Sequence, residues 1–253
     1  MTTVSDTELY RCGAKTLLAS WDAYTRGSPG AAVIRAPGVA AAVFPTEPER
    51  SVYNNALLHQ GLGPAARVEA VAAMEAAYTS AAVSRFAAWV HETDAAMRAE
   101  FEARGYTIDT STRAMGMAMG DLRLPRPSLD LAPPDWPAYL RLLARDGAPS
   151  GLLADADPSD FRVLIARFDG EDVAAALAFD FDDDRGIYNI GTLPHARRRE
   201  LGTALTALLV HEAAARGCRT ASLQSTPMGE RVYAAVGFRD LGRILEYVPP
   251  AVA

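Results

Sequence analysis

Cysteine and lysine are both scarce in this sequence. The two cysteines, Cys12 and Cys218, lie far apart and form no CxxC pair, so their spacing indicates neither a disulfide framework nor a zinc site. We therefore expect a reducing compartment. Lys15 is the sole lysine among 25 basic residues. The arginine bias suggests a GC-rich coding sequence more than a mechanism.

Long apolar runs and an excess of positive charge are also missing. No segment approaches the roughly 20 apolar residues of a membrane span, and residues 1–6 are polar, unlike a signal peptide. The formal net charge of −6 indicates no broad basic surface for nucleic acid, and it slightly favours cationic substrates such as amines. We expect a cytoplasmic protein without a membrane or nucleic-acid partner.

The residues that are present are typical of a folded α/β protein. Hydrophobic residues make up 49% of the 253 positions and charged residues 22%, which suits one large domain or two small ones. Periodicity and turn residues predict the order of the first half: a helix over 7–26, strands over 31–35, 39–44 and 53–58, a helix over 64–78, a strand over 85–90, a helix over 94–104 and a strand pair over 105–119.

The stretch over residues 187–209 organises the second half. Residues 187–193 predict a buried strand that ends at Pro194, and leucines then recur at helical spacing from Leu201. Three arginines, 197–199, lie at the turn between them. A helix N-terminus presents unpaired N–H groups and a partial positive charge, so we expect an anion site that accepts phosphate.

The remaining second-half elements surround this stretch. We expect a helix over 136–146, a hairpin of strands 160–168 and 173–181 joined by a tight turn, and a strand over 221–226. Acidic residues follow the hairpin: Asp180, Asp182, Asp183 and Asp184. They are compatible with a metal site, but such clusters are usually a solvated turn, so no metal is expected.

Two motifs give the second half a specific resemblance. Arg197-Arg-Arg-Glu-Leu-Gly202-Thr-Ala204 resembles the pyrophosphate loop of the GNAT acyltransferase superfamily, with Glu200 in place of the first glycine. Tyr233-Ala-Ala-Val-Gly237-Phe238 resembles the ending of that family, and the resemblance covers roughly residues 160–247. The alternative is an arginine-rich, solvated helix start in an ordinary α/β domain.

The first half repeats the order of the second. Tyr53, Arg85 and Gly105 precede Tyr188, Arg219 and Gly237 by 135, 134 and 132 residues. The resemblance therefore implies an α/β (α+β) tandem GNAT fold in two copies, each a mixed, mostly antiparallel sheet flanked by helices. We expect a GNAT-like domain over 1–124, a proline-rich linker over 125–135 and a catalytic domain over 136–253. Coincidental similarity between two α/β units is the alternative.

The two halves differ where chemistry is expected. The first half has no arginine cluster at the corresponding turn, and Pro64 has no N–H to offer an anion. Phe101 stands there four residues before the glycine, where the second half has Tyr233. We expect the degenerate first copy to contribute structure and part of a substrate wall, and the second copy to bind cofactor.

The resemblance implies an acetyl-CoA-dependent N-acetyltransferase that acts on a small amine, with a peptide or protein amine as another acceptor. Tyr233 would protonate the leaving sulfur, although its ring also suits simple packing. A base is not identified: Tyr188, Asp180 and Asp182 are candidates, and a neutral amine needs none. The rival function is a non-catalytic acyl-CoA-binding or regulatory protein. We expect a monomer or homodimer.

The resemblance also assigns the cofactor-binding residues. The pyrophosphate is assigned to the loop and helix start, the pantetheine arm to the preceding strand, and Ser225 departs from the asparagine of many relatives. The expected contacts are Gly191, Thr192, Leu193, Arg197, Arg198, Arg199, Leu201, Gly202, Thr203 and Ser225.

Overall fold

The computed structural model describes residues 4–49, 53–147 and 151–250. The chain forms two compact units. The first comprises Met1–Ser20 and Arg113–Leu241, and the second comprises Trp21–Thr112 and Gly242–Ala253. Helix α1 (Asp6–Thr25) and strands β5 (Thr107–Ala118) and β10 (Arg239–Val248) run from one unit into the other.

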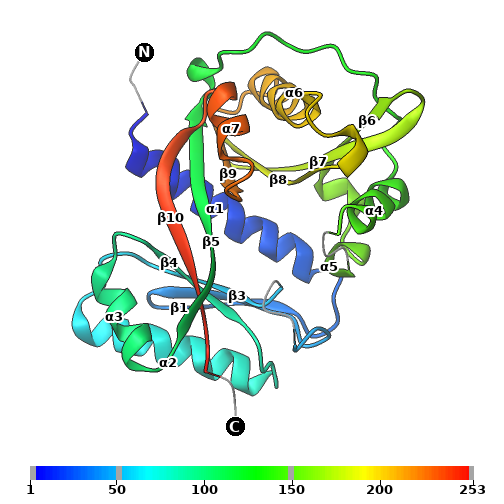
Figure 1. Cartoon of the computed structure of the whole chain (residues 1–253). Helices are drawn as coiled ribbons and strands as arrows, with labels where there is room; N and C mark the ends of the chain where they lie inside the picture. Colours follow the sequence, from blue (N-terminus) through cyan, green and yellow to red (C-terminus); the bar gives the residue numbers. More distant parts are fainter. Residues whose placement is uncertain (1–3, 50–52, 148–150, 251–253) are drawn as a thin grey trace. The chain divides into compact units, whose positions relative to one another are not determined.

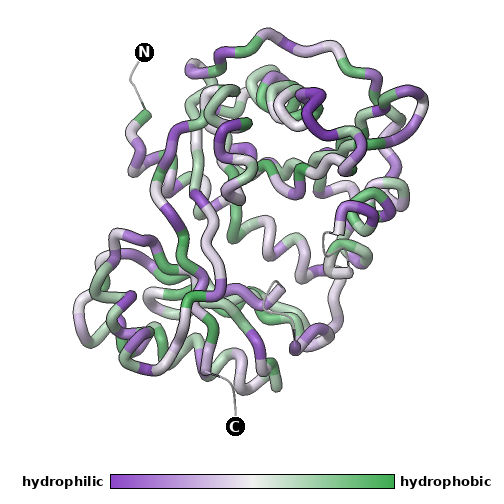
Figure 2. The backbone as a smooth tube through the Cα atoms, viewed as in Figure 1, coloured by the Kyte–Doolittle hydropathy of each residue, from purple (hydrophilic) through white to green (hydrophobic). Residues whose placement is uncertain are grey.

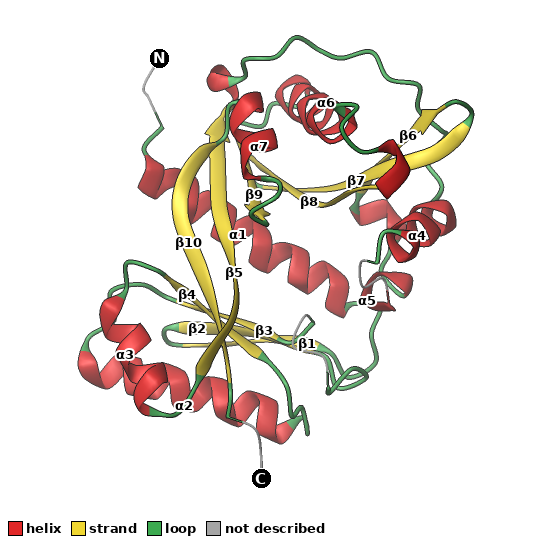
Figure 3. Ribbon diagram, viewed as in Figure 1, coloured by secondary structure: helices red, strands yellow, loops and turns green. Residues whose placement is uncertain are grey.

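The first unit is a mixed sheet with helices beside it (Figures 1 and 3). Its strand order is β6-β7-β8-β9-β5, in which only β8 and β9 run parallel. Its elements after β5 are η1 (Met119–Asp121), α4 (Trp136–Arg145), α5 (Gly151–Ala154), η2 (Pro158–Asp160), β6 (Arg162–Phe168), β7 (Glu171–Phe181), β8 (Asp184–Thr192), η3 (Pro194–Ala196), α6 (Leu201–Ala215), β9 (Thr220–Ser225) and α7 (Glu230–Val236).

Local sequence explains the central elements of this unit. Asp169 and Gly170 both have positive φ, 52° and 80°, as the tight turn between β6 and β7 requires. The middle of β7 and most of α6 are buried. Both are also apolar, as the green colour in Figure 2 shows. Such continuous apolar runs are typical of elements covered on both sides.

The second unit has the strand order β1-β2-β3-β4-β10, with only β3 and β4 parallel. Aromatic rings fill its core: Tyr78 stacks on Phe86 at 4.2 Å, and Phe101 stacks on Tyr247 at 5.4 Å between ring centroids. Its elements after α1 are β1 (Ala32–Ala36), β2 (Val39–Val43), β3 (Asn55–Leu58), α2 (Pro64–Ser80), β4 (Ala87–His91) and α3 (Ala95–Ala103).

The predicted α/β fold with mostly antiparallel strands flanked by helices is confirmed. The series β1, β2, β3, α2, β4, α3, β5 matches the series β6, β7, β8, α6, β9, α7, β10 in order. In each compact unit, however, the fifth strand comes from the other series, because β5 pairs with β9 and β10 pairs with β4. The compact units therefore differ from the expected division at residues 124 and 136.

Two local predictions were wrong. Where a strand pair was expected over 105–119, the chain forms one long strand, β5 (Thr107–Ala118). Gly116 serves close packing there instead of a turn, since a Cβ would lie 2.9 Å from Leu241 Cδ1. The acidic turn is only partly solvated: Asp184 is buried and accepts hydrogen bonds from the hydroxyls of Thr220 and Ser222, both at 2.6 Å.

The proline-rich segment is extended, as predicted, and it also covers the edge of β6. Asp130 accepts a hydrogen bond from the N–H of Arg167 at 2.8 Å, and Ala132 donates to Ile165 at 2.9 Å. These bonds satisfy backbone groups that an edge strand would otherwise leave exposed.

Candidate active site

Strands β8 and β9 separate part-way along their length. Their parallel pairing runs from Asp184↔Thr220 to Gly186↔Ser222, although β8 continues to Thr192. The register of β8 against β7 shifts beyond Tyr188, and Asn189 has a positive φ of 50°. Such a bulge bends the strand. The backbone of β8 beyond Gly186 therefore presents an edge along which another extended chain can pair.

A pocket of about 590 Å³ lies beside this open edge. Its wall comes from β8, the turn and first residues of α6, the loop after β9 and α7. It is lined by ten residues singled out from the sequence: Gly191, Thr192, Arg197, Arg198, Arg199, Glu200, Leu201, Gly202, Thr203 and Tyr233.

Two other residues expected at the cofactor belong instead to the framework. Leu193 is buried, and its N–H donates to the Val173 carbonyl at 2.9 Å. Ser225 is also buried, and its hydroxyl donates to the Thr226 carbonyl at 2.8 Å. Neither is among the residues that line the pocket.

The turn before α6 has the backbone of an anion-binding loop. Arg198 and Glu200 are left-handed, with φ of 62° and 59°. Each left-handed non-glycine residue costs roughly 1–2 kcal/mol, and such strain is often found at functional sites. α6 begins directly afterwards at Leu201. Its first N–H groups have no earlier helical carbonyl to bind, so they can receive an anion.

Arg197 holds two parts of the pocket wall together. Its Nε donates to the Thr192 carbonyl at 2.9 Å, and its Nη2 donates to Asp146 Oδ1 at 2.9 Å. Asp146 follows the last residue of α4. Arg197 therefore fixes the end of β8 and the end of α4, and its charge is already paired.

The other two loop arginines differ in their surroundings. The Arg199 guanidinium lies 4.1 Å from the centre of the Phe168 ring, which is a cation–π contact. Arg198 makes no hydrogen bond or ion pair to any residue that the structure describes. Of the three arginines, Arg198 is thus the one with an unpaired guanidinium at the pocket.

Tyr233, on α7, also lines the pocket. Gly229 allows its ring to pack closely, because a Cβ there would lie 2.7 Å from Tyr233 Cε2. Burial raises the pKa of Tyr233 to about 12. The phenol therefore stays protonated near neutral pH and is a proton donor. The corresponding Phe101 is fully buried in the aromatic core of the second unit.

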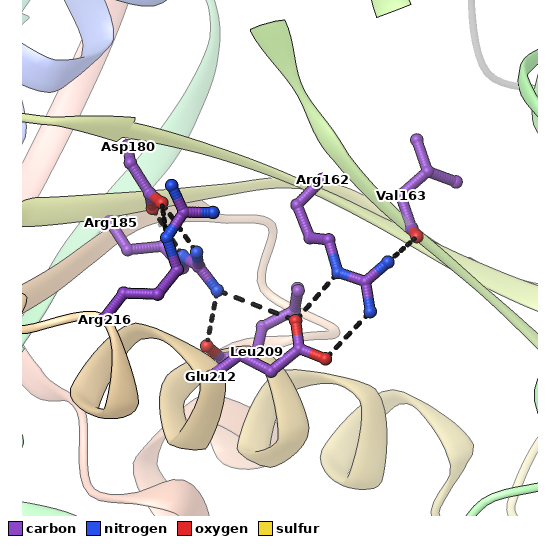
Figure 4. Close-up of polar contacts among 7 residues, drawn as sticks. All are labelled: Arg162, Val163, Asp180, Arg185, Leu209, Glu212 and Arg216. Carbon is purple, nitrogen blue, oxygen red and sulfur yellow. Dashed lines mark hydrogen bonds and ion pairs between the residues drawn. The ribbon is translucent and has the colours of Figure 1, made fainter. Parts of the chain in front are cut away.

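The candidate base Asp180 belongs to a buried ion-pair network instead (Figure 4). Arg185 is fully buried and donates to both oxygens of Asp180, at 2.5 and 2.7 Å, and to the Leu209 carbonyl at 2.9 Å. Nearby, Arg162 donates to both oxygens of Glu212, each at 2.8 Å. These bonds fix α6 to β6, β7 and β8, and so hold the helix that follows the arginine-containing turn.

Sequence reasoning missed Asp146, Met228, Gly229 and Val232, which also line the pocket. Tyr188 and Asp182, the other candidate bases, do not line it. Within the described ranges, no group of three or more His, Cys, Asp or Glu side chains could hold a metal ion. No helix there has both the length and the apolar character to cross a membrane.

The sequence matches the family model of the acetyltransferase (GNAT) domain over residues 65–229. The chain belongs to the GNAT acetyltransferase family. The match begins in α2 and ends directly before α7, so it extends well upstream of the region whose motifs suggested a GNAT protein. A comparison with curated proteins found no match.

Solved GNAT structures share this fold. A GCN5-related N-acetyltransferase from Kribbella flavida is 18% identical, with a TM-score of 0.72 over 96% of each chain. One from Sphaerobacter thermophilus is 16% identical, with a TM-score of 0.62 over 94% of this chain and 87% of the other. A tandem GNAT protein from the clavulanic acid biosynthesis pathway is 15% identical, with a TM-score of 0.57 over 99% and 98%.

Proposed function

We propose that this GNAT protein is an acetyl-CoA-dependent N-acetyltransferase that acts on the amine of a small molecule. The observation that carries the proposal is the open edge of β8, which leads directly into the phosphate-type loop before α6. Acetyl-CoA, when bound, supplies an acetyl group activated as a thioester.

The residues present suit the parts of that cosubstrate. The free N–H groups at the start of α6 and the guanidinium of Arg198 suit phosphate. Gly191 and Thr192 line the pocket on the part of β8 that is not paired with β9. This edge, at which the Thr192 carbonyl already accepts from Arg197, suits an arm that carries amide groups. A volume of about 590 Å³ lies in the usual range for a small-molecule pocket.

The chain's own groups then have defined tasks. Backbone N–H groups on the open edge would stabilise negative charge on the carbonyl oxygen. Tyr233 would donate its proton to the sulfur that leaves as the amine nitrogen bonds to the acetyl carbon. The proton lost by the amine goes to solvent, and solvent returns a proton to Tyr233.

We further propose that the chain holds two GNAT copies, of which the first binds no cofactor. β3 and β4 stay paired through Leu57↔Trp89, next to the last residue of β3, so no edge opens there. The Gly61 N–H, in the turn that corresponds to the phosphate loop, donates to Asp94 Oδ2 at 3.0 Å. A carboxylate of the chain thus takes the place where an anion would bind. The fold shared with a protein described as a tandem GNAT supports this reading.

One observation favours the rival, a non-catalytic acyl-CoA-binding or regulatory protein. Glu200 puts a carboxylate on the pocket wall within the phosphate-type loop, where it repels phosphate. The protonated Tyr233 in the same pocket favours catalysis instead.

Mixing the protein with acetyl-CoA and a panel of primary amines, and following free thiol, separates the two functions. Amine-dependent thiol release that Tyr233→Phe strongly reduces is the expected result. Tight CoA binding without thiol release for any amine would favour the non-catalytic function.

A further inference from the structure

Asp146 is a carboxylate at an electrostatically unfavourable position. It follows the last residue of α4, where the helix carbonyls already carry partial negative charge. It lines the pocket, and its side chain is only 19% exposed. A carboxylate in such a place needs cations beside it, and Arg197 Nη2 at 2.9 Å from Oδ1 is the first of them.

The second oxygen of Asp146 lies against the open strand. A Cβ on residue 191 would lie only 2.8 Å from Asp146 Oδ2. The glycine therefore allows the carboxylate to lie close against the backbone of β8. Among the residues that the structure describes, no donor is bonded to Oδ2. One oxygen is therefore fixed by Arg197, and the other has no donor among the described residues.

We propose that Asp146 binds the nitrogen of the acceptor amine through Oδ2. This inference rests on the proposed acetyl transfer. The attacking nitrogen must come within about 3–3.5 Å of the acetyl carbon, which places it along the open edge of β8. Asp146 Oδ2 adjoins that edge at Gly191.

Asp146 is the pocket carboxylate that remains for a cationic acceptor. The cationic lining residues of the pocket are the three arginines 197–199, which repel an ammonium group, and its other carboxylate, Glu200, belongs to the phosphate-type loop. Asp146 is thus the group that would hold a cationic amine against the repulsion of these arginines. Arg197 is a positioning residue, because it orients the carboxylate that contacts the substrate.

A binding experiment tests this role without requiring turnover. 1,4-Diaminobutane is titrated calorimetrically into the CoA-saturated protein, and CoA is titrated separately into the free protein. Asp146→Asn keeps an oxygen that can accept from Arg197 but removes the charge. It should weaken diaminobutane binding roughly 10- to 100-fold and leave CoA affinity within about 3-fold. Asp183→Asn, at an exposed carboxylate outside this pocket, is the matched control and should change neither.

The outcomes separate this inference from the proposed function. Equal losses for diaminobutane and CoA would mean that Asp146 only supports the wall, and would overturn the assignment. Unchanged diaminobutane affinity in Asp146→Asn, or no binding to the CoA-saturated wild type, would overturn it too. Failure of the wild type to bind CoA would instead refute the proposed acetyl transfer.

Discussion

Replacing Glu200 with glycine should stabilise the fold. Glu200 is left-handed, with φ of 59° and ψ of 12°, and its side chain makes no capping hydrogen bond to α6. That backbone costs a non-glycine residue roughly 1–2 kcal/mol, while the extra freedom of unfolded glycine offsets about 0.5–1 kcal/mol. We expect a net gain of about 0.5–1 kcal/mol, which raises Tm by about 1–4 °C in a chain of this size.

The same change should tighten CoA binding. A unit charge about 7 Å from one phosphate charge contributes roughly 0.6 kcal/mol at the dielectric constant of water. For a doubly charged pyrophosphate the total is about 1 kcal/mol, so removal of the Glu200 carboxylate should lower the CoA Kd about 3- to 10-fold at low salt. Pantetheine, which lacks phosphate, should bind unchanged.

Calorimetric titration and thermal unfolding, with two further variants, separate strain from charge. Glu200→Gln removes the charge but keeps the strained backbone, so it should tighten CoA without raising Tm. Ala82→Gly relieves a similar φ of 54° in the second unit, so it should raise Tm without changing CoA affinity. Equal gains for CoA and pantetheine would refute the reasoning, as would stabilisation by Ala82→Gly but not by Glu200→Gly.

Three further predictions follow from the site and its surroundings. Tyr233→Phe should lower kcat roughly 10²- to 10⁴-fold with little change in CoA Kd; an unchanged rate in the thiol assay would remove it as the acid. Arg198→Gln should weaken CoA roughly 10-fold, and more than Arg199→Gln, whose guanidinium stacks on an aromatic ring; the reverse order in titrations would contradict this. Burial and nearby Asp109 raise the pKa of Glu246 from 4.5 to about 7. The folded chain therefore binds this proton more tightly than the unfolded chain does. The free energy of unfolding should fall by up to roughly 3 kcal/mol as the pH rises from about 4.5 to 7. Glu246→Gln should flatten that dependence in urea unfolding.

The strand, turn and helix around residues 187–215 could be predicted because their signals are local. A β-branched apolar run, a proline and leucines at helical spacing define β8, the turn and α6 without any distant contact. The same holds for the aspartate-glycine turn between β6 and β7, where the two residues alone select the turn type.

Features that depend on distant contacts could not be predicted. Asp146 ends a helix and looks like an ordinary polar residue until the fold places Arg197 and Gly191 beside it. Asp184 is buried because Thr220 and Ser222, from the neighbouring strand, satisfy its oxygens. The pairing of β5 with β9 and of β10 with β4 also depends on distant contacts. Because the two strand series are similar, no local sequence pattern shows which series each strand will pair with.

The stoichiometry of CoA binding tests the central claim, that the second half alone holds the cofactor. Calorimetric titration of the intact chain should give one site. Gly202→Val should abolish it, because the nearest atom to a Cβ at 202 is 3.9 Å away on Ile190 and the larger side chain would fill the phosphate loop. Gly63→Val, at the corresponding turn, has nothing within 4 Å and should leave binding intact. Two sites per chain, or one site that survives Gly202→Val and is lost in Gly63→Val, would contradict the account.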